Sequence, residues 1–469
     1  MLDPEPDLST RLLSHIDFTS GAVAAVSGGS DSTALLLLLK QYLDRTAPSA
    51  RLLAVTVDHG LRQDSAAEAQ AVARLCAERG IAHRTLVWSG RKPSTGLPAA
   101  AREARYRLLA KVARGEGMGL IVTGHTADDQ AETVLMRETR EEGVGRNKGS
   151  GREEGRGLAG MAPATLHDWR EWIVRPLLGT RRAALRDFLR RQNVGWADDP
   201  TNADETYERP RLRAALEGDA GAQRVDGALA LAARAALDRT QLGLAAAEVI
   251  LRFARQPATG LIRLDPALLR AGEDRAAVYA LRILLATSGG VAYLPDKARG
   301  EALFGRLKAG FLCATLSRTV VDFRRAGIFL RREMRGLPPA AAVLDAAIWD
   351  GRRQITLNDG NGALLIAPLG AAAAKRLATG KGDTTPQSLI SAALAAEPAA
   401  RQALEKPGSA PDWPASPGFE ARPVVAPFAR FLPSFDLAPA RAAASLVGAP
   451  PVPAPPFAGH SAGRSWAKA

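Results

Sequence analysis

Short apolar runs alternate with amphipathic stretches through the first third of the chain. Runs with the length and residue types of buried strands occupy residues 21–26, 52–57, 82–88, 120–123 and 172–178. Apolar residues recur at helical spacing in residues 32–43, 65–78, 97–113 and 127–137. Strands and helices that alternate in this way predict an α/β fold with a doubly wound parallel sheet. Ligands of such folds bind beyond the carboxyl ends of the strands.

The pattern changes beyond residue 215. Residues 216–310 are rich in alanine and leucine at helical spacing, which predicts a helical middle domain. From residue 311 short strand-like runs, for example 319–323 and 328–331, predict a small mixed α+β C-terminal domain. The proline-rich segments 407–417 and 450–456 indicate extended linkers or a partly disordered tail. We therefore expect three domains, at residues 1–215, 216–310 and 311–469.

Composition and charge narrow the class of protein. The chain has 469 residues, is 46% hydrophobic and carries a formal net charge of +13. The hydrophobic content is sufficient for packed cores. The positive charge attracts polyanions and favours a nucleic-acid partner, although a basic surface also serves solubility alone. The N-terminus lacks the basic and apolar parts of a secretory signal, and the leucine run at 34–39 is too short to span a membrane. We expect a cytoplasmic protein with no membrane partner.

Cysteine usage argues against sulfur chemistry. The two cysteines, Cys76 and Cys313, lie far apart in the sequence, and neither belongs to a CxxC pair. This spacing argues against a disulfide framework, a zinc site and a paired-thiol redox centre.

A loop rich in serine and glycine follows the first predicted strand and opens the first predicted helix. It consists of Ser27, Gly28, Gly29, Ser30, Asp31 and Ser32. Backbone N–H groups and the helix dipole converge there on a point suited to an anion, and the two glycines allow close approach of the main chain. The three hydroxyls add donors, and Asp31 can hold Mg²⁺ against phosphates. The loop is neither a P-loop nor a GxGxxG fingerprint, and it predicts a phosphate cradle rather than a plain turn.

The loop resembles the SGGxDS motif of the N-type ATP pyrophosphatases, also called PP-loop enzymes. The resemblance implies that ATP is split between its α and β phosphates and that AMP passes to an oxygen of the acceptor. Members include enzymes similar to GMP synthetase and argininosuccinate synthetase, as well as tRNA-modifying enzymes. The motif alone therefore indicates only the superfamily.

Further motifs over the first 215 residues resemble those of the tRNA(Ile)-lysidine synthases in the same order. They are DHGLR at 58–62 with Ser65 and Glu68, AREARY at 101–106, GHTADDQAET at 124–133, GLAGM at 157–161, RPLL at 175–178 and DPTN at 199–202. The resemblance implies that ATP adenylates the carbon-2 oxygen of the wobble cytidine in an isoleucine tRNA with a CAU anticodon. Free L-lysine then displaces AMP and gives lysidine.

Three residues of the GHTADDQAET motif are spaced to share one face of a helix. They are His125, Asp129 and Glu132, four and three residues apart. A solvated helix face is the plain alternative. The family implies an acidic lysine site at Asp129 and Glu132, and a metal site is the other reading. Exposing a neutral lysine amine at pH 7 costs roughly 4.6 kcal/mol, so some group must take its proton. His125 suits that task by its ordinary pKa, and capping a turn or touching a phosphate are its alternatives.

Other charged residues are weaker candidates. Arg102 and Arg105 lie three apart on the predicted helix 97–113 and can face the adenylate, the RNA backbone or solvent. Asp58 and His59 end the second predicted strand, where the base or ribose of a nucleotide usually lies. The Gly-rich, charged segment 138–157 is longer than the loop of the family and either orders on tRNA or is an inert insertion. The first candidates for tRNA phosphate contacts are Arg209, Arg211 and Arg213.

Two alternatives to lysidine synthesis remain. One is another PP-loop tRNA-modifying enzyme, such as a tRNA thiolation enzyme, although the cysteine-dependent kind needs paired thiols that this chain lacks. The other is a non-catalytic RNA-binding relative with a relic nucleotide pocket, against which the presence of Asp31, Asp129 and Glu132 argues.

Overall fold

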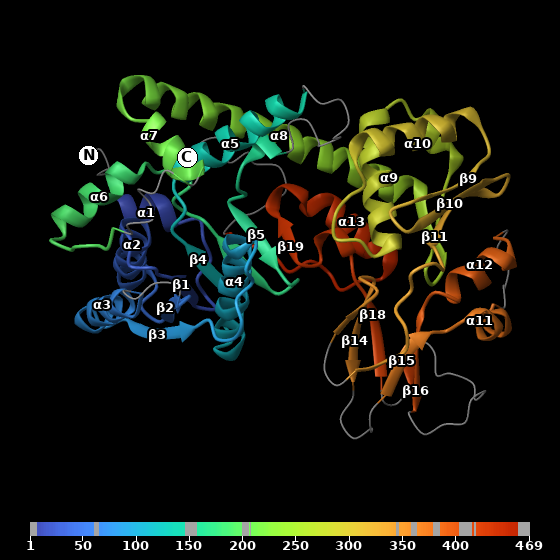
Figure 1. The fold of residues 1–469 in the computed structure, drawn as a ribbon, viewed down its shortest axis with the longest axis horizontal. Coiled ribbons are helices and arrows are strands. Elements are labelled where there is room, and N and C mark those ends of the chain that lie inside the picture. The colour runs from blue at the N-terminus through green and yellow to red at the C-terminus, as the bar shows by residue number, and fades with distance from the viewer. Residues whose placement is uncertain are drawn as a thin grey trace. The chain divides into compact units, whose positions relative to one another are not determined.

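The computed structural model describes most of the chain as two compact units (Figure 1). The described residues are 7–60, 65–145, 157–198, 206, 208–343, 347–357, 364–378, 385–402, 415–416 and 419–457. The first unit comprises Met1–Lys148, Glu154–Leu237 and Pro453–Ala469, and the second comprises Gly149–Glu153 and Asp238–Val452. The expected division into three domains stays a prediction.

A mostly parallel sheet forms the centre of the first unit. Its strands are β1 (Ala22–Ala25), β2 (Leu52–Asp58), β3 (Ala82–Val87), β4 (Leu120–Thr123), β5 (Ala164–His167) and β6 (Glu171–Val174). Within this unit they follow the order β5-β6-β4-β1-β2-β3, and only β5 runs antiparallel to its neighbour. The chain moves outward from β1 to β3 and then returns to the other side of β1. The predicted doubly wound α/β fold is confirmed.

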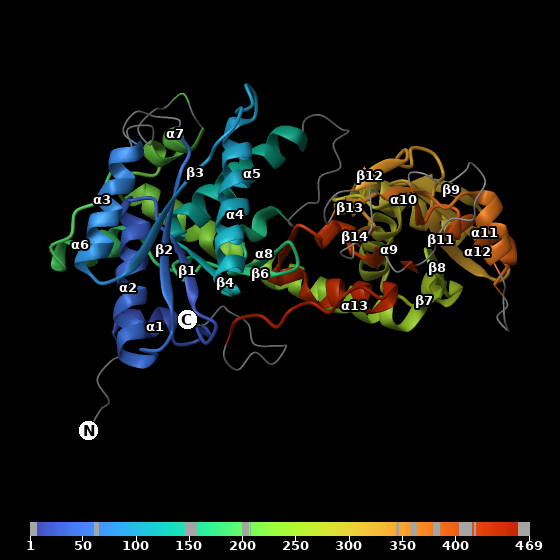
Figure 2. The same ribbon diagram turned by 90° about the horizontal axis from the view of Figure 1, so that it is seen from below.

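Helices cover both faces of this sheet (Figure 2). The helices of the first unit are α1 (Leu8–Leu13), α2 (Ser30–Thr46), α3 (Ser65–Glu78), α4 (Leu97–Gly115), α5 (Ala127–Gly145), α6 (Arg182–Arg191) and α7 (Glu208–Ala215). Since parallel crossovers are right-handed, the reversal of direction after β3 places α4 on the face opposite α2 and α3. The helices predicted at 32–43, 65–78, 97–113 and 127–137 are confirmed as α2 to α5. The sequence pattern did not indicate α6, α7 or β5.

Packing explains the two longest apolar patterns of the first unit. The leucines of α2 from Leu35 to Leu39 are at most 2% exposed, because the helix lies between the sheet and other helices. On the opposite face, the buried side of α4 packs its Tyr106 and Leu109 against Val23, Val55 and Ile121 of the strands. Burial of this kind stabilises a fold by about 25 cal/mol per Å² of apolar surface.

The second unit contains antiparallel sheets and helices. Helix α8 (Gly218–Phe253) contributes residues to both units, and α9 (Asp274–Gly289) and α10 (Lys297–Ala309) belong to the second. The first sheet has the order β7-β8-β11-β10-β9. Its strands are β7 (Ala254–Ala258), β8 (Leu261–Leu264), β9 (Cys313–Leu316), β10 (Thr319–Arg324) and β11 (Gly327–Arg332). Residues 216–310 are mostly helical, as expected, but also hold β7 and β8, which the sequence pattern did not indicate.

Two smaller sheets complete the second unit, in the orders β12-β15-β16 and β13-β14-β18-β17. Their strands are β12 (Ala341–Val343), β13 (Ala347–Trp349), β14 (Arg353–Leu357), β15 (Leu364–Pro368), β16 (Pro398–Gln402), β17 (Ala415–Ser416) and β18 (Phe419–Pro423). This unit also contains α11 (Ala371–Leu377), α12 (Gln387–Leu394), β19 (Phe431–Pro433) and α13 (Leu437–Val447). The expected mixed α+β texture beyond residue 311 is confirmed.

Two further observations bear on the sequence expectations. The proline-rich segment 450–456 leads to Phe457, which forms a β-bridge with Ile16, while Asp17 N–H donates to Pro456 O at 3.0 Å. Among the described residues, no helix is long and apolar enough to cross a membrane.

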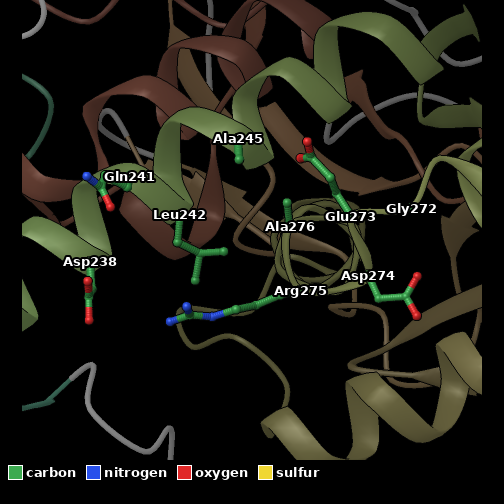
Figure 3. Close-up of a pocket in the computed structure, with 9 residues that line it drawn as sticks. All are labelled: Asp238, Gln241, Leu242, Ala245, Gly272, Glu273, Asp274, Arg275 and Ala276. Atoms are coloured by element: carbon green, nitrogen blue, oxygen red, sulfur yellow. The ribbon is translucent and has the colours of Figure 1, made fainter.

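A pocket of about 400 Å³ opens in the second unit between α8 and the start of α9 (Figure 3). It is lined by Asp238, Gln241, Leu242, Ala245, Gly272, Glu273, Asp274, Arg275 and Ala276. Three of these side chains are acidic and one is basic, so the pocket is a poor receptor for phosphates. None of the site residues predicted from the sequence lines it.

Candidate active site

The site residues predicted from the sequence lie in segments that follow the strands, at one edge of the sheet. Strand β1 pairs on one side with β2 and on the other with β4, in parallel, with Ala25 aligned to both Val55 and Thr123. The order in which the chain adds strands to the sheet therefore reverses at β1. The crevice between β1 and β4 is the switch point at which such folds bind ligands. The serine-glycine loop follows β1, and His125 follows β4.

The serine-glycine loop presents the free end of α2. Gly29 is the N-cap of this helix, and no side chain caps it. The first N–H groups of a helix have no intrahelical acceptor, so they remain available to an anion. Gly28 has a φ of +88°, which glycine adopts without strain. The Ser32 hydroxyl instead ties the loop together: it donates to Gly29 O and accepts from Ser27 N–H, each at 3.1 Å.

Gly124 allows the turn after β4 to pack against the first turn of α2. A Cβ atom at Gly124 would lie 2.9 Å from Asp31 O and 3.0 Å from Ser32 Cα, closer than real Cβ atoms approach backbone. The absence of a side chain at this position therefore brings the GHTADDQAET segment directly against the serine-glycine loop.

His125 lies in a cationic part of the crevice. Its Nδ1 is 3.0 Å from Thr123 Oγ1. Burial, together with the nearby Arg175, Arg102 and Arg105, lowers the pKa of His125 to about 3 against the opposing effect of Asp129. The imidazole is therefore neutral at pH 7. It can accept a proton, but in the enzyme without nucleotide it is a weak base.

Asp129 and Glu132 are buried, with 9% and 2% of their surface exposed. Asp129 Oδ2 accepts hydrogen bonds from Thr126 N–H at 2.9 Å and from the Thr126 hydroxyl at 3.1 Å, which fixes the start of α5. Burial raises the pKa of Asp129, but Arg182 and the Thr126 N–H outweigh it, and the net shift is downward. Asp129 is therefore ionised at neutral pH.

Two arginines that the sequence did not single out for this role neutralise the carboxylates. Arg182, at the start of α6, donates from Nε to Asp31 Oδ2 at 2.9 Å and from Nη2 to Asp129 Oδ1 at 3.0 Å. Arg213, on α7, donates from Nε to Glu132 Oε1 at 2.7 Å and from Nη2 to Glu132 Oε2 at 3.2 Å. The predicted acidic face exists, but it is paired rather than open to solvent.

This pairing also decides which of the arginines predicted to contact tRNA remain accessible on α7. Arg213 is held by Glu132, whereas Arg209 and Arg211 are exposed. Arg211 donates to Thr206 O at 3.0 Å. Only the two exposed arginines keep the accessibility that a tRNA phosphate contact requires.

A segment after α6 lies along the serine-glycine loop. Ala197 N–H donates to Gly28 O at 2.9 Å. Arg186, one helical turn beyond Arg182, places Nε 3.5 Å from Ser30 Oγ and stacks 5.6 Å above the ring of Trp196. Arg186 adds positive charge at the N-terminus of α2. The basic run RRAALR was the only feature of the sequence that pointed to Arg186.

The remaining predicted residues surround the same edge. Arg102 and Arg105 on α4 are exposed, and Arg102 lies 5.1 Å above the Tyr106 ring. Asp58 accepts from Gly60 N–H at 2.7 Å, and this bond is the main cause of its lowered pKa. Asp58 therefore shapes the turn after β2.

His59 follows Asp58 and contacts the edge of Trp88, with ring centroids 5.8 Å apart. Burial lowers the pKa of His59 to about 4, and its two ring nitrogens are buried without a hydrogen-bond partner. A neutral ring with unpaired nitrogens beside the crevice is compatible with the expected contact to a base or ribose.

Asp31 of the serine-glycine loop is the candidate carboxylate for a magnesium ion. Among the residues that the structure describes, no group of three or more His, Cys, Asp and Glu side chains is placed to hold a metal. Mg²⁺ bound to a nucleotide needs only one or two protein carboxylates, since phosphates and water supply the other ligands. Asp31 fits that requirement, with its Oδ2 shared with Arg182.

Some motif residues lie outside the described residues. They are Leu61 and Arg62 of the DHGLR motif, positions 146–156 of the charged insertion, and the DPTN motif at 199–202.

The chain is similar in sequence to a known domain family and to named enzymes. Residues 7–218 match the PP-loop domain family model. The chain is 73% identical over 462 residues to a tRNA(Ile)-lysidine synthase of Mesorhizobium japonicum, covering 98% of this chain and all of that protein. It is 40% identical over 353 residues to the tRNA(Ile)-lysidine synthase of Brucella melitensis, covering 74% and 76% of the two chains. Among solved structures, the U34-tRNA thiolase NcsA from Methanococcus maripaludis matches 48% of this chain and 77% of its own at 16% identity, with a TM-score of 0.36.

Proposed function

This chain belongs to the tRNA(Ile)-lysidine synthase family and catalyses ATP-dependent lysidine formation on an isoleucine tRNA, and we propose that its reaction takes place at the crevice between β1 and β4. The observation that carries this placement is the Arg182 guanidinium, which joins Asp31 of the serine-glycine loop to Asp129 of α5. Groups suited to a triphosphate and groups suited to an amine thus converge on one point.

The first step uses ATP at the serine-glycine loop. The N–H groups at the start of α2 and the hydroxyl of Ser30 bind phosphate oxygens of ATP, with Arg186 beside them. Asp31 would hold a Mg²⁺ ion here, and the ion would neutralise phosphate charge. The carbon-2 oxygen of the wobble cytidine attacks the α-phosphorus, pyrophosphate leaves, and an adenylated cytidine remains.

The second step uses free L-lysine. Asp129 and Glu132 bind the ammonium groups of lysine, and its ε-amine attacks carbon 2 of the cytidine while AMP leaves with the oxygen. The amine must lose a proton, and His125 accepts it. Because the pKa of His125 is about 3 without nucleotide, direct transfer from an ammonium group would be uphill by roughly 10 kcal/mol. The bound phosphates raise that pKa by supplying negative charge to the cationic crevice, and His125 acts as a base in that state.

Other residues orient the two substrates. Arg102 and Arg105 face the adenylate or the RNA backbone from α4, where both act electrostatically on His125. Asp58 and His59 lie at the end of the neighbouring strand and contact the base or ribose of ATP.

The substrate tRNA carries a CAU anticodon, and the predicted domains 216–310 and 311–469 engage it. The cytoplasm, where tRNA and ATP are available, is the proposed compartment.

The proposal is tested by incubating the protein with ATP, labelled lysine and total tRNA. The expected result is label in isoleucine tRNA only, with pyrophosphate release that requires both lysine and tRNA. Asp31→Asn and Asp129→Asn should abolish labelling, whereas Arg191→Met, on the exposed side of α6, should retain it. Labelling of another tRNA, or pyrophosphate release without lysine transfer, would contradict the proposal.

A further inference from the structure

Arg182 contacts three carboxylates with three different nitrogens. Nε pairs with Asp31 at 2.9 Å, Nη2 with Asp129 at 3.0 Å, and Nη1 lies 3.8 Å from Glu132 Oε1. Arg213, the other cation of this cluster, lies 3.6 Å from Asp129 Oδ1 and 2.7 Å from Glu132 Oε1. Arg182 is therefore the link between the carboxylate of the nucleotide loop and the carboxylates of α5.

This arrangement leaves little room for a substrate cation. Asp129 Oδ2 is occupied by Thr126, and Asp129 Oδ1 is occupied by Arg182. Both oxygens of Glu132 are bonded to Arg213, and only 2% of the Glu132 side chain is exposed. A lysine ammonium group needs acceptor oxygens and is repelled by an adjacent guanidinium. The Arg182 guanidinium therefore occupies Asp129 Oδ1, the oxygen that the ammonium group requires.

The side chain of Arg182 can leave while its backbone stays in place. Its backbone N–H donates to Asp128 Oδ2 at 2.6 Å, which anchors the start of α6 to α5. The side chain itself is 20% exposed and lies at the loop where the triphosphate binds. Mg²⁺ competes with Arg182 for Asp31, and the phosphates offer the guanidinium bidentate oxygen acceptors in place of the carboxylates.

We propose that Arg182 is a positioning residue that couples the two substrates: it closes the Asp129 and Glu132 site in the enzyme without nucleotide, and it moves to the phosphates when Mg²⁺ and ATP bind, which opens that site to lysine. The inference rests on the proposed function of this crevice. Since coupling between two ligands is reciprocal, bound lysine also tightens the binding of nucleotide.

The test is equilibrium dialysis of labelled lysine against the full-length protein, with and without Mg²⁺ and α,β-methylene ATP. In the wild type we expect lysine to bind about ten-fold more tightly with the analogue. In Arg182→Met the dissociation constant for lysine should be the same in both conditions and lower than that of the wild type without analogue. Arg182→Lys keeps the charge but has one nitrogen in place of the three that reach the carboxylates, and it should show a smaller ratio. Arg191→Met on the same helix is the matched control and should behave as the wild type.

A wild-type ratio of one, an equal ratio in wild type and Arg182→Met, or no lysine binding by Arg182→Met overturns the coupling. If Arg182→Met does not fold, as judged by thermal unfolding, the ratio of Arg182→Lys decides: a ratio equal to that of the wild type overturns the proposal. Lysidine formation is measured on the same preparations. A wild type that forms lysidine but shows no coupling refutes only this inference, whereas one that forms no lysidine refutes the proposed function.

Discussion

The Nε atom of Arg182 lies 2.9 Å from Oδ2 of Asp31, although 151 positions separate the two residues in the sequence. The contact joins the start of α6 to the start of α2, and the same guanidinium reaches Asp129 at the start of α5. Three helix N-termini thus meet at one edge of the parallel sheet. Their dipoles favour the negative charge that a triphosphate brings.

The close approach at Gly124 makes a steric prediction. Gly124→Ala places a Cβ 2.9 Å from the backbone of Asp31, and neither backbone segment can yield without moving the serine-glycine loop. We expect a loss of about 1–3 kcal/mol in the free energy of unfolding and a large rise in the KM for ATP. Urea unfolding and steady-state kinetics measure these effects. Gly119→Ala is the control, since no atom lies within 4 Å of its new Cβ, and equal behaviour of the two variants would contradict the account.

The Glu132 and Arg213 pair predicts a coupled effect on stability. Glu132 is buried, and Glu132→Gln removes the negative charge 2.7 Å from the Arg213 guanidinium, while Asp129 stays 3.6 Å away. We expect Glu132→Gln to lower the free energy of unfolding by about 2–4 kcal/mol. Adding Arg213→Met should recover part of that loss, since the second change removes the uncompensated charge. A double-mutant cycle from urea unfolding gives the interaction, and strictly additive losses would show that the pair does not contribute.

We expect the pKa of His125 to depend on whether nucleotide is bound. Burial and the surrounding arginines hold its pKa at about 3, so the ring should stay neutral from pH 5 to 8 in the enzyme alone. With Mg²⁺ and α,β-methylene ATP bound, we expect its pKa to rise because the phosphates add negative charge. NMR of the ring carbons measures this, with the signal of His125 assigned by its loss in His125→Gln. A ring that titrates near pH 6.5 without nucleotide would contradict the prediction.

The ion pairs of Glu397 predict that the stability of the second unit falls at acid pH. Burial raises the pKa of Glu397, but Arg353 and Arg352 outweigh it and the pKa lies below its usual value. A lowered folded-state pKa gives stability that is complete above the unfolded-state pKa, about 4.3, and is lost as the pH falls through the folded-state value. We therefore expect the free energy of unfolding to fall below about pH 4.3 more steeply in the wild type than in Glu397→Gln.

Denaturant unfolding from pH 7 to pH 3 measures that slope. At pH 7, Glu397→Gln should be less stable by about 3 kcal/mol, because Arg352 and Arg353 are themselves buried. The control is Glu420→Gln, whose partner Arg422 is exposed, so little change is expected. Parallel pH profiles for the wild type and Glu397→Gln would refute the linkage.

The exposed arginines of α7 predict a salt effect on tRNA binding. Each phosphate contact adds about 0.7–0.9 to the slope of log K against log salt. Arg209→Gln and Arg211→Gln should each reduce the slope by about that amount, as measured by filter binding at several salt concentrations. Arg11→Gln, an exposed change on α1, serves as the control. An unchanged slope in both α7 variants would place the RNA contacts elsewhere.

Local patterns were sufficient to predict the elements that carry the chemistry. The apolar runs before Ser27 and His125 indicated the two strands that flank the switch point, and the motifs that follow them indicated the site. The pairing of the acidic face was not predictable, since Arg182 and Arg213 come from helices far along the chain whose short basic sequences resemble ordinary solvated surface. The strands β7 and β8 were missed because they are short and lie between alanine-rich helices.

The protonation state of His125 could not be predicted from the sequence either. Its ordinary pKa made it a natural base, but three arginines gather around it from α4 and from the segment after β6. A pKa depends on that assembly, which arises only when β4 and β6 pair in the sheet.

The structure of the protein with Mg²⁺ and α,β-methylene ATP tests the central claim most directly. The account predicts phosphates on the N–H groups at the start of α2, Mg²⁺ at Asp31, and an Arg182 guanidinium that has left Asp129. A nucleotide bound elsewhere, with Arg182 still bridging Asp31 and Asp129, would contradict it.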